Sequence, residues 1–511
     1  MIRRIVSTRS LQHFANANAR PTGVACREFA TRRQKKKNNI NNKKQPGNKI
    51  MFQSLGCPRN HVDTEVMIGI VLQAGLELTQ DSQQADYLVV NTCGFLQAAR
   101  DESSEAIQQL LSEKRPNSKL LVTGCMVNLH KEQILESYPE VDHVLGSGAV
   151  DKVLEAIKGI HVDEYDNSNA DEKEVVKAER KSFLEAGDTP RFLATPPHYA
   201  YLKIAEGCRK RCSFCIIPKI KGRLQSKPVD QIVTEFQGLL DTGASEIIMI
   251  AQDLGDYGKD LKMKQTGLAT LLKAMLKSDP RDFWLRLLYL YPDEITPEVL
   301  DVLESDPRIC RYLDMPIQHI SDDMLKLMKR TTTAKDIKST ITMLRQRLPG
   351  IIIRTSLMVG FPGETEEHFQ ELLQFVQEYE LDNVGVFTYS NEELAWSSRL
   401  PDHLSEEVKQ DRYHRIMQVQ LEVTKRKNQA LLDQKKCLEV VIEGFHPEHD
   451  DLIVGRYYGQ CPDIDGQIIV NDVDELGKLP NAGHRYWVEV TDFDNYDLIG
   501  KIVKEPSAAT K

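Results

Sequence analysis

GCRKRCSFC, at positions 207–215, spaces Cys208, Cys212 and Cys215 as C-x3-C-x2-C directly after the apolar run HYAYLKIAE. Three thiols leave a structural zinc ion one ligand short, because closed zinc sites are usually four-coordinate. A 4Fe–4S cube also has four corners, so three thiolates hold it and leave one iron open to another ligand. The motif therefore indicates an iron–sulfur cluster with one open iron.

A second trio of cysteines lies upstream, at the ends of three predicted strands. Cys57, Cys93 and Cys125 close the apolar runs IMFQSLGC, DYLVVNTCGF and KLLVTGC. Helical patterns over 61–74 and 95–113 separate these runs, so the strands should be parallel and their carboxyl ends should share one sheet edge. A single buried cysteine is more often an inert core residue. Three of them at one sheet edge predict a second cluster.

The order of apolar runs and helical patterns predicts an α/β chain with three folded domains. Residues 49–160 form an N-terminal parallel α/β domain around the upstream trio, and 161–195 form a linker. Six strand–helix units then favour a partial (β/α)6 barrel over 196–433, with its chemistry at the C-terminal ends of the strands. Five short strands without helices indicate a small antiparallel β-barrel over 434–505.

The start of the chain differs in charge from everything that follows. Residues 1–49 contain seven Arg and six Lys against one acid, Glu28, although the whole chain has a net charge of −9. Such an Arg-rich, acid-poor start is typical of organellar transit peptides. We therefore expect 1–48 to be a transit peptide and disordered linker that directs the protein to a mitochondrion, or alternatively a plastid. A basic tail that binds nucleic acid is the other interpretation.

The cysteine motif at 207–215 resembles that of the radical S-adenosylmethionine (SAM) enzymes. Over 49–503 the chain is similar to the methylthiotransferases of that superfamily, and most similar to their ribosomal-protein branch, the RimO type. Where this chain has SLGCPRN, the tRNA-modifying relatives typically have a GCQMN-like string. The resemblance is carried by SLGCPRNHVDTE at 54–65, NTCGFLQAARDES at 91–103, LDMPIQHISDDML at 313–325 and GQCPDIDGQ at 459–467.

This resemblance implies a fold, an activity and a set of cofactors. The three domains would be a cluster domain, a radical SAM barrel and a C-terminal TRAM barrel. The activity would be the addition of a methylthio group to the β-carbon of an aspartate in a small-subunit ribosomal protein. Two 4Fe–4S clusters and SAM would be needed, with Cys57, Cys93 and Cys125 holding the auxiliary cluster and the 207–215 cysteines the radical cluster. No catalytic residue beyond these ligands is implied.

Six residues near strand ends are predicted to contact the cofactor. The string MVGFPGETEEHF at 358–369 indicates a close backbone approach to a nucleoside, and the aromatic residue inside the 207–215 motif would pack against the cluster. For the polar residues, a structural hydrogen bond is the alternative role. The predicted cofactor-binding residues are Phe214, Glu246, Gln252, Gln318, Gly360 and Phe361.

Charge separates the possible substrates. Residues 437–505 contain 15 acids and five bases, and an acidic barrel should repel tRNA and attract a basic ribosomal protein. This charge favours the ribosomal protein as the substrate and leaves a tRNA adenosine 2-methylthiotransferase as the alternative function. A non-catalytic iron–sulfur or ribosome-assembly protein is a third possible function. The expected partners are the ribosomal protein, a sulfur donor and a flavodoxin- or ferredoxin-type electron donor. No membrane partner is expected, because no apolar run approaches the roughly 18–20 residues of a membrane span.

Overall fold

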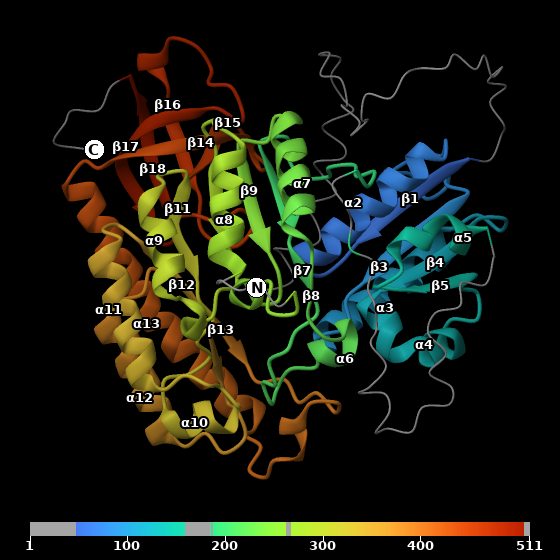
Figure 1. Cartoon of the computed structure of the whole chain (residues 1–511), viewed down its shortest axis with the longest axis horizontal. Coiled ribbons are helices and arrows are strands. Elements are labelled where there is room, and N and C mark those ends of the chain that lie inside the picture. Colours follow the sequence, from blue (N-terminus) through green and yellow to red (C-terminus); the bar gives the residue numbers. More distant parts are fainter. Residues whose placement is uncertain (1–47, 159–183, 185–187, 262–266, 505–511) are drawn as a thin grey trace.

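A computed structural model describes residues 48–158, 184, 188–261 and 267–504. The predicted leader, apart from Asn48, lies outside the described residues, and so does most of the predicted linker. Figure 1 shows the N-terminal domain beside the central barrel and the C-terminal barrel at one end of it. Among the helices of the described ranges, none combines the length and hydrophobicity that a membrane crossing needs.

The N-terminal domain is a five-stranded sheet whose neighbouring strands are all parallel. Successive strand residues point to opposite faces, so Leu88 and Val90 pack against α3 and α4, whereas Val89 packs against α2 and α5. Both faces are thus covered, as in other parallel sheets. The elements are β1 (Lys49–Ser54), α2 (Pro58–Gln73), β2 (Glu77–Leu78), β3 (Tyr87–Thr92), α3 (Gln97–Glu113), β4 (Lys119–Gly124), α4 (Cys125–Ser137), β5 (His143–Gly146) and α5 (Val153–Ile157).

The central domain is an open sheet of six parallel strands, as the sequence predicted for a partial barrel. Its order is β13-β12-β11-β10-β9-β6. The strands are β6 (Tyr199–Lys203), β9 (Glu246–Ile250), β10 (Trp284–Leu287), β11 (Ile309–Asp314), β12 (Ile352–Val359) and β13 (Asn383–Thr388). A small hairpin pairs β7 (Ala205–Glu206) with β8 (Gln225–Ser226) beside the cysteine motif.

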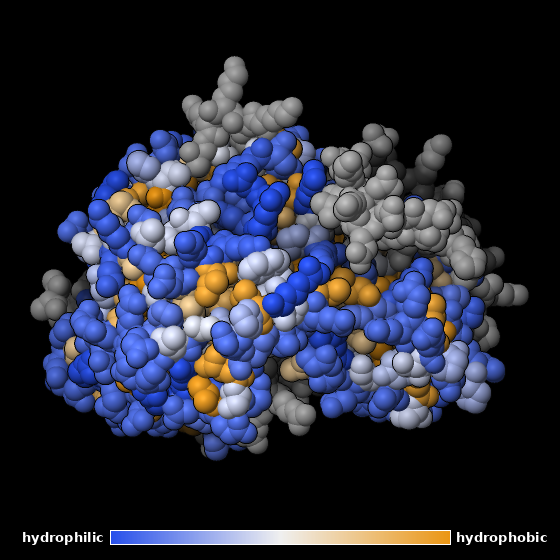
Figure 2. Space-filling model, turned by 90° about the horizontal axis from the view of Figure 1, so that it is seen from below, coloured by the Kyte–Doolittle hydropathy of each residue, from blue (hydrophilic) through white to orange (hydrophobic). Residues whose placement is uncertain are grey.

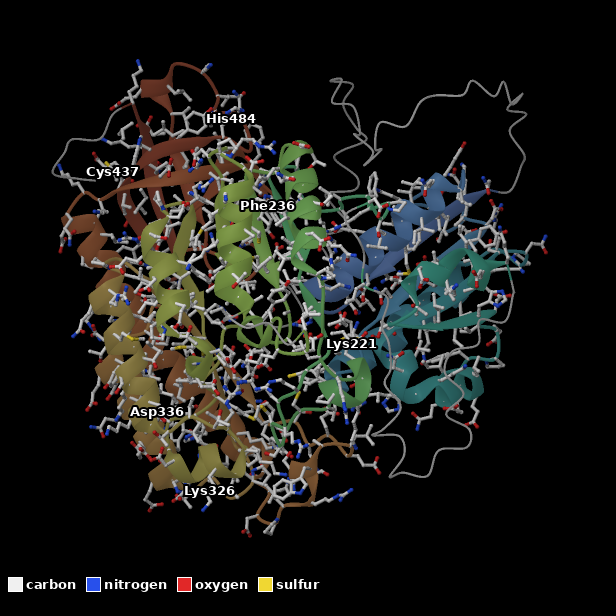
Figure 3. The ribbon with its side chains drawn as sticks, in the orientation of Figure 1. Lys221, Phe236, Lys326, Asp336, Cys437 and His484 are labelled. Carbon is white, nitrogen blue, oxygen red and sulfur yellow. The ribbon has the colours of Figure 1, made fainter. Side chains whose placement is uncertain are left out.

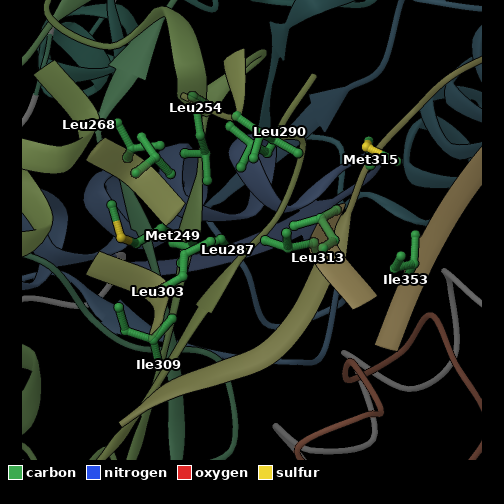
Figure 4. Packing of buried hydrophobic residues seen from close by; sticks show 14 of the residues in the cluster. Met249, Leu254, Leu268, Leu287, Leu290, Leu303, Ile309, Leu313, Met315 and Ile353 are labelled. Carbon is green, nitrogen blue, oxygen red and sulfur yellow. The ribbon is translucent and has the colours of Figure 1, made fainter. Parts of the chain in front are cut away.

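Helices follow the barrel strands and cover their outer side, and the segment with the cysteine motif, between β7 and α6, lies on the side of the carboxyl ends of the strands (Figure 1). Between sheet and helices lies the largest hydrophobic core, in which Met249, Leu287 and Leu313 of successive strands stack (Figure 4). The helices are α6 (Ile217–Lys221), α7 (Val229–Asp241), α8 (Gly267–Ser278), α9 (Pro297–Ser305), α10 (Asp322–Leu327), α11 (Ala334–Arg347), α12 (Glu366–Tyr379) and α13 (Glu406–Asp433).

The C-terminal domain is a closed barrel of five strands in the order β14-β15-β16-β18-β17. The prediction of a purely antiparallel barrel was wrong at one place, because β16 and β18 run parallel. Strand direction reverses at every antiparallel pair, so a closed ring with an odd number of strands needs one parallel pair. The strands are β14 (Cys437–His446), β15 (His449–Tyr457), β16 (Ile468–Asp472), β17 (Arg485–Asp494) and β18 (Asp497–Val503).

Candidate iron–sulfur site

The upstream cysteines follow three adjacent strands of one sheet. Cys57 precedes α2, Cys93 follows β3, and Cys125 begins α4 directly after β4. Gly56 has a φ of +88°, and a Cβ at this position would lie 2.9 Å from the Cβ of Cys93. A residue without a side chain is therefore required where the β1 loop meets the β3 loop. The parallel sheet brings the three thiols to one edge, as predicted.

The chemistry of this trio fits a metal cluster. Burial raises the pKa of Cys93 to about 11 and that of Cys125 to about 12, and the neighbouring thiols of the trio add to both shifts. Free thiols with such pKa values are protonated at neutral pH. Thiolates are the metal ligands, so metal binding releases these protons and is coupled to folding. The trio thus has the burial and ligand count of a three-cysteine cluster site.

The second trio lies in the loop between β7 and α6, and each of its sulfurs accepts a hydrogen bond. Lys210 N donates to Cys208 Sγ at 3.4 Å, Ile217 N to Cys215 Sγ at 3.4 Å, and Arg330 Nη1 to Cys212 Sγ at 3.6 Å. Such donors favour the thiolate form and tune a bound cluster. At Cys208 the donor only partly opposes burial, which raises the pKa of this thiol to about 11.

Arg330 was missed by the sequence analysis. It lies 118 residues from Cys212 in the chain, donates to Pro316 O at 2.5 Å, and places its guanidinium 4.1 Å from the ring centre of Tyr291. No local motif marks it, because only the packing of the segment after α10 against the cysteine loop brings it to the sulfur. Ser213 fixes that packing by hydrogen bonding to Met328 O and Leu327 O.

A buried network of four charged side chains joins the N-terminal domain to the central barrel beside both trios. Lys203 Nζ lies 2.5 Å from Asp63 Oδ1, and Lys221 Nζ lies 3.2 Å from Asp63 Oδ2. Glu206 completes the network, 3.4 Å from Lys221 and 3.6 Å from Lys203. Figure 3 shows Lys221 at this junction. Two cations balance two anions, so the network is neutral overall.

Gln252 and Gln318 lie at the carboxyl side of the barrel strands. Gln252 Nε2 donates to Glu206 Oε1 at 2.6 Å, while its Oε1 is buried and has no donor among the described residues. An orphaned buried acceptor of this kind fits a ligand N–H or O–H group. Gln318 has a φ of +72° and is held by hydrogen bonds to the backbone of Ser356 and Met358 in β12. Backbone strain in a residue other than glycine is often found at functional sites.

Phe214 and Phe361 belong to one apolar cluster that lies beside the cysteine loop. Phe361 is fully buried, and its ring meets that of Tyr389 edge to face at 5.3 Å. Phe214 packs on the same cluster. Gly360 makes the predicted close approach, but its neighbour is Lys409 of α13, whose Cγ would lie 2.3 Å from an added Cβ. For Gly360 the structure thus gives a packing reason for glycine.

The position of Glu246 contradicts its predicted role in cofactor binding. It begins β9 and so lies at the amino end of the strand, whereas the cysteine trios follow carboxyl ends. Its carboxylate accepts from Arg286 Nε at 2.6 Å and from Arg456 Nη2 of β15 at 2.9 Å. Glu246 therefore holds the C-terminal barrel against the central one. The sequence pattern correctly placed Glu246 at the start of the strand, but the cofactor-binding role predicted for it was wrong, because the cysteines lie at the other end.

Three family models match the chain. "Uncharacterized protein family UPF0004" matches residues 49–146, "Radical SAM superfamily" matches 202–376, and "TRAM domain" matches 436–503. Among solved structures, the radical S-adenosylmethionine methyltransferase TsrM from Kitasatospora setae is similar with a TM-score of 0.49 and 15% identity, over 67% of this chain and 75% of that chain.

Curated relatives match along nearly the whole chain. "Ribosomal protein uS12 methylthiotransferase RimO" of Protochlamydia amoebophila is 52% identical over 89% of this chain and 93% of its own length. The protein of the same name from Chlamydia felis is 49% identical over 90% of this chain and 96% of its own length. That of Bdellovibrio bacteriovorus is 41% identical over 89% and 98%.

These relatives contradict the predicted mitochondrial or plastid location, because they are bacterial proteins and bacteria have neither organelle. The prediction was based on the composition of residues 1–48, of which 1–47 lie outside the described residues. A positive charge with few acids is shared by transit peptides and by other basic segments. Composition alone was therefore too weak a signal for a location.

Proposed function

Because the chain belongs to the RimO family of ribosomal protein uS12 methylthiotransferases, we propose that it adds a methylthio group to the β-carbon of an aspartate in that ribosomal protein. It is a methylthiotransferase of the radical SAM type. The observation that carries the proposal is the pair of cysteine trios joined by α2. Cys57 directly precedes this helix, and Asp63 within it forms an ion pair with Lys203 of the barrel strand that leads to the second trio.

The two trios have different proposed roles. The radical SAM family uses one 4Fe–4S cluster and SAM, and we assign that cluster to Cys208, Cys212 and Cys215. We assign a second cluster to the upstream trio. When bound, these groups supply the one-electron chemistry that activates a C–H bond and the sulfur that replaces the hydrogen. Sulfur lost in each turnover requires a sulfur donor, and the radical chemistry requires an electron donor of the flavodoxin or ferredoxin type.

The residues of the chain hold and orient these groups. Arg330 and the backbone N–H groups of Lys210 and Ile217 donate to the sulfurs of the radical trio. Gln252 offers its unpaired Oε1 to SAM, and the apolar cluster around Phe214 and Phe361 excludes water from one side. Seen from below, the molecule is mostly hydrophilic, with hydrophobic side chains gathered near the centre of this face (Figure 2).

The charge of the C-terminal barrel supports a protein substrate. Residues 437–505 carry 15 acids against five bases. Nucleic-acid affinity comes largely from Lys and Arg that neutralise phosphates, so this composition disfavours tRNA. Ribosomal proteins are commonly basic, and a negative surface attracts them at long range.

The test is anaerobic reconstitution followed by turnover. Two cubes should give about eight iron and eight sulfide per chain. With SAM and a reductant, the loaded enzyme should add a methylthio mass to the aspartate of uS12, as read by mass spectrometry, and release deoxyadenosine. Cys212→Ala should abolish both products. A methylthio mass on tRNA alone, or metal-loaded protein that releases no deoxyadenosine, would contradict the proposal.

A further inference from the structure

Arg59 reaches from the upstream trio to the mouth of the barrel. It follows Cys57 by two residues, in the first turn of α2. Its Nη1 donates to Ala251 O, just beyond β9, at 2.6 Å. Its guanidinium carbon lies 5.4 Å from the ring centre of Tyr289, beyond the end of β10. One side chain of the N-terminal domain therefore enters the region where the barrel strands end.

The cation lies between the two trios. Arg59 lies two residues after Cys57 of the first trio, and the carbonyl that it contacts belongs to Ala251, the neighbour of Gln252. Gln252 in turn donates its Nε2 to Glu206 Oε1 at 2.6 Å, and Glu206 precedes Cys208 of the second trio by two residues. A group bound to this guanidinium would be close to both proposed clusters.

Most of the hydrogen-bonding capacity of Arg59 is unused. A guanidinium has five N–H donors in a planar fork, and the contact with Ala251 uses one nitrogen. Among the described residues no acceptor contacts its remaining nitrogens, and the side chain is partly exposed. No carboxylate of the described residues pairs with Arg59. By contrast, Arg354 of β12 is paired with Asp314 at 2.7 Å.

Tyr289 gives the guanidinium a fixed place. Its φ of +63° is in the left-handed region, which is costly for an aromatic residue and is retained where the surrounding structure enforces it. The ring lies beside the guanidinium and limits the space in which the fork can move.

We propose that Arg59 binds the side-chain carboxylate of the substrate aspartate and so sets its β-carbon between the two trios. This inference rests on the proposed function. The fork of arginine matches a carboxylate in a two-point contact. The β-carbon is bonded directly to the carboxylate carbon, so fixing the carboxylate also fixes the carbon that is modified. Arg59 is thus a specificity-determining residue that favours aspartate over its neutral amide.

The test is a double-mutant cycle between Arg59 and the substrate carboxylate. Binding of uS12 to the cluster-loaded enzyme is measured by fluorescence anisotropy with SAM but without reductant, so that no turnover occurs. The substrate carries either the target aspartate or asparagine in its place. Charged hydrogen bonds of this kind change affinity by about ten- to a hundredfold. The wild-type enzyme should prefer aspartate by about that factor, and Arg59→Met should lose the preference.

Two further variants show whether a lost preference for aspartate is due to the Arg59 fork or to a general effect of the substitution. Arg311→Met is the matched control, because Arg311 is exposed on β11 and also donates to one backbone carbonyl, that of Pro349 at 2.6 Å; it should keep the preference. If Arg59→Met loses iron or sulfide, Arg59→Lys retains the charge without the fork and should show a reduced preference.

The outcomes separate this inference from the proposed function. A wild-type enzyme that modifies uS12, together with an Arg59→Met enzyme that still prefers aspartate to the same degree, overturns the role of Arg59 alone. A wild-type enzyme that neither binds nor modifies uS12 overturns both. Loss of the preference in Arg59→Met, with cluster content and Arg311→Met unchanged, supports both.

Discussion

Removing Asp63 should destabilise the protein far more than removing an exposed acid. Asp63, Lys203, Lys221 and Glu206 are each at most 4% exposed, and Asp63 contacts both lysines, at 2.5 and 3.2 Å. Without Asp63, two buried cations share a single anion. Breaking a buried ion pair in this way costs about 3–5 kcal/mol. Asp63→Leu should therefore lower the free energy of unfolding by about that amount, measured by urea unfolding of the apoprotein with circular dichroism.

Two further proteins test whether the uncompensated charge is the cause. Asp63→Leu combined with Lys203→Met leaves one cation facing one anion and should recover most of the loss, because apolar groups of similar size can replace a buried pair. Glu155→Ala breaks an exposed ion pair, in which the side chain of Lys152 is 43% exposed and that of Glu155 is 45% exposed. This substitution should cost at most about 1 kcal/mol. A loss below 1 kcal/mol in Asp63→Leu, or no recovery in the double variant, would refute the reasoning.

Three more outcomes follow from the site and its surroundings. Gly56→Ala should lower the iron content to about four per chain, because the added Cβ displaces the neighbouring thiol; an unchanged iron assay would contradict this. Arg330→Met should lower the reduction potential of the radical cluster in an EPR titration, because the Cys212 sulfur loses a donor, whereas Arg330→Lys should shift it less. Although burial opposes ionisation, Arg191 lowers the pKa of Glu65 to about 2, so this carboxylate stabilises the fold above its ordinary pKa. That stability, about 3 kcal/mol, should be lost as the pH falls from 4.5 to 2, and the Tm of Glu65→Gln should depend less on pH over that range.

Much of the architecture could be predicted from the sequence. Apolar runs that end in cysteine located β1, β3 and β4, and six further runs located the strands of the central barrel, because strand periodicity and helix periodicity are local properties of the chain. The sequence also allowed us to predict that the upstream cysteines lie together, since parallel strands put their carboxyl ends on one edge of the sheet. The five strands of the last barrel were found, but the parallel pair of β16 and β18 was not, because it results from ring closure.

The side chains that act between elements could not be predicted in this way. Arg330 meets Cys212 across 118 residues, and Arg191 joins Glu65 of α2 to Glu235 of α7. No spacing rule connects residues on different elements. Glu246 shows the reverse error: a polar residue beside a predicted strand was given a site role, although it lies at the amino end, where it pairs with arginines.

The sequence by itself predicted which residues are candidates to hold iron, and it determined in what order the domains come and which end of each strand carries the thiols. These properties depend on residue type and on short-range periodicity. Only the tertiary structure decided which charges surround the thiols, because the placement of Arg59, Arg330 and Lys221 requires elements from separate parts of the chain to pack together. Electrostatic interactions depend on distance in space and on burial, and neither is written in the spacing of residues along the chain.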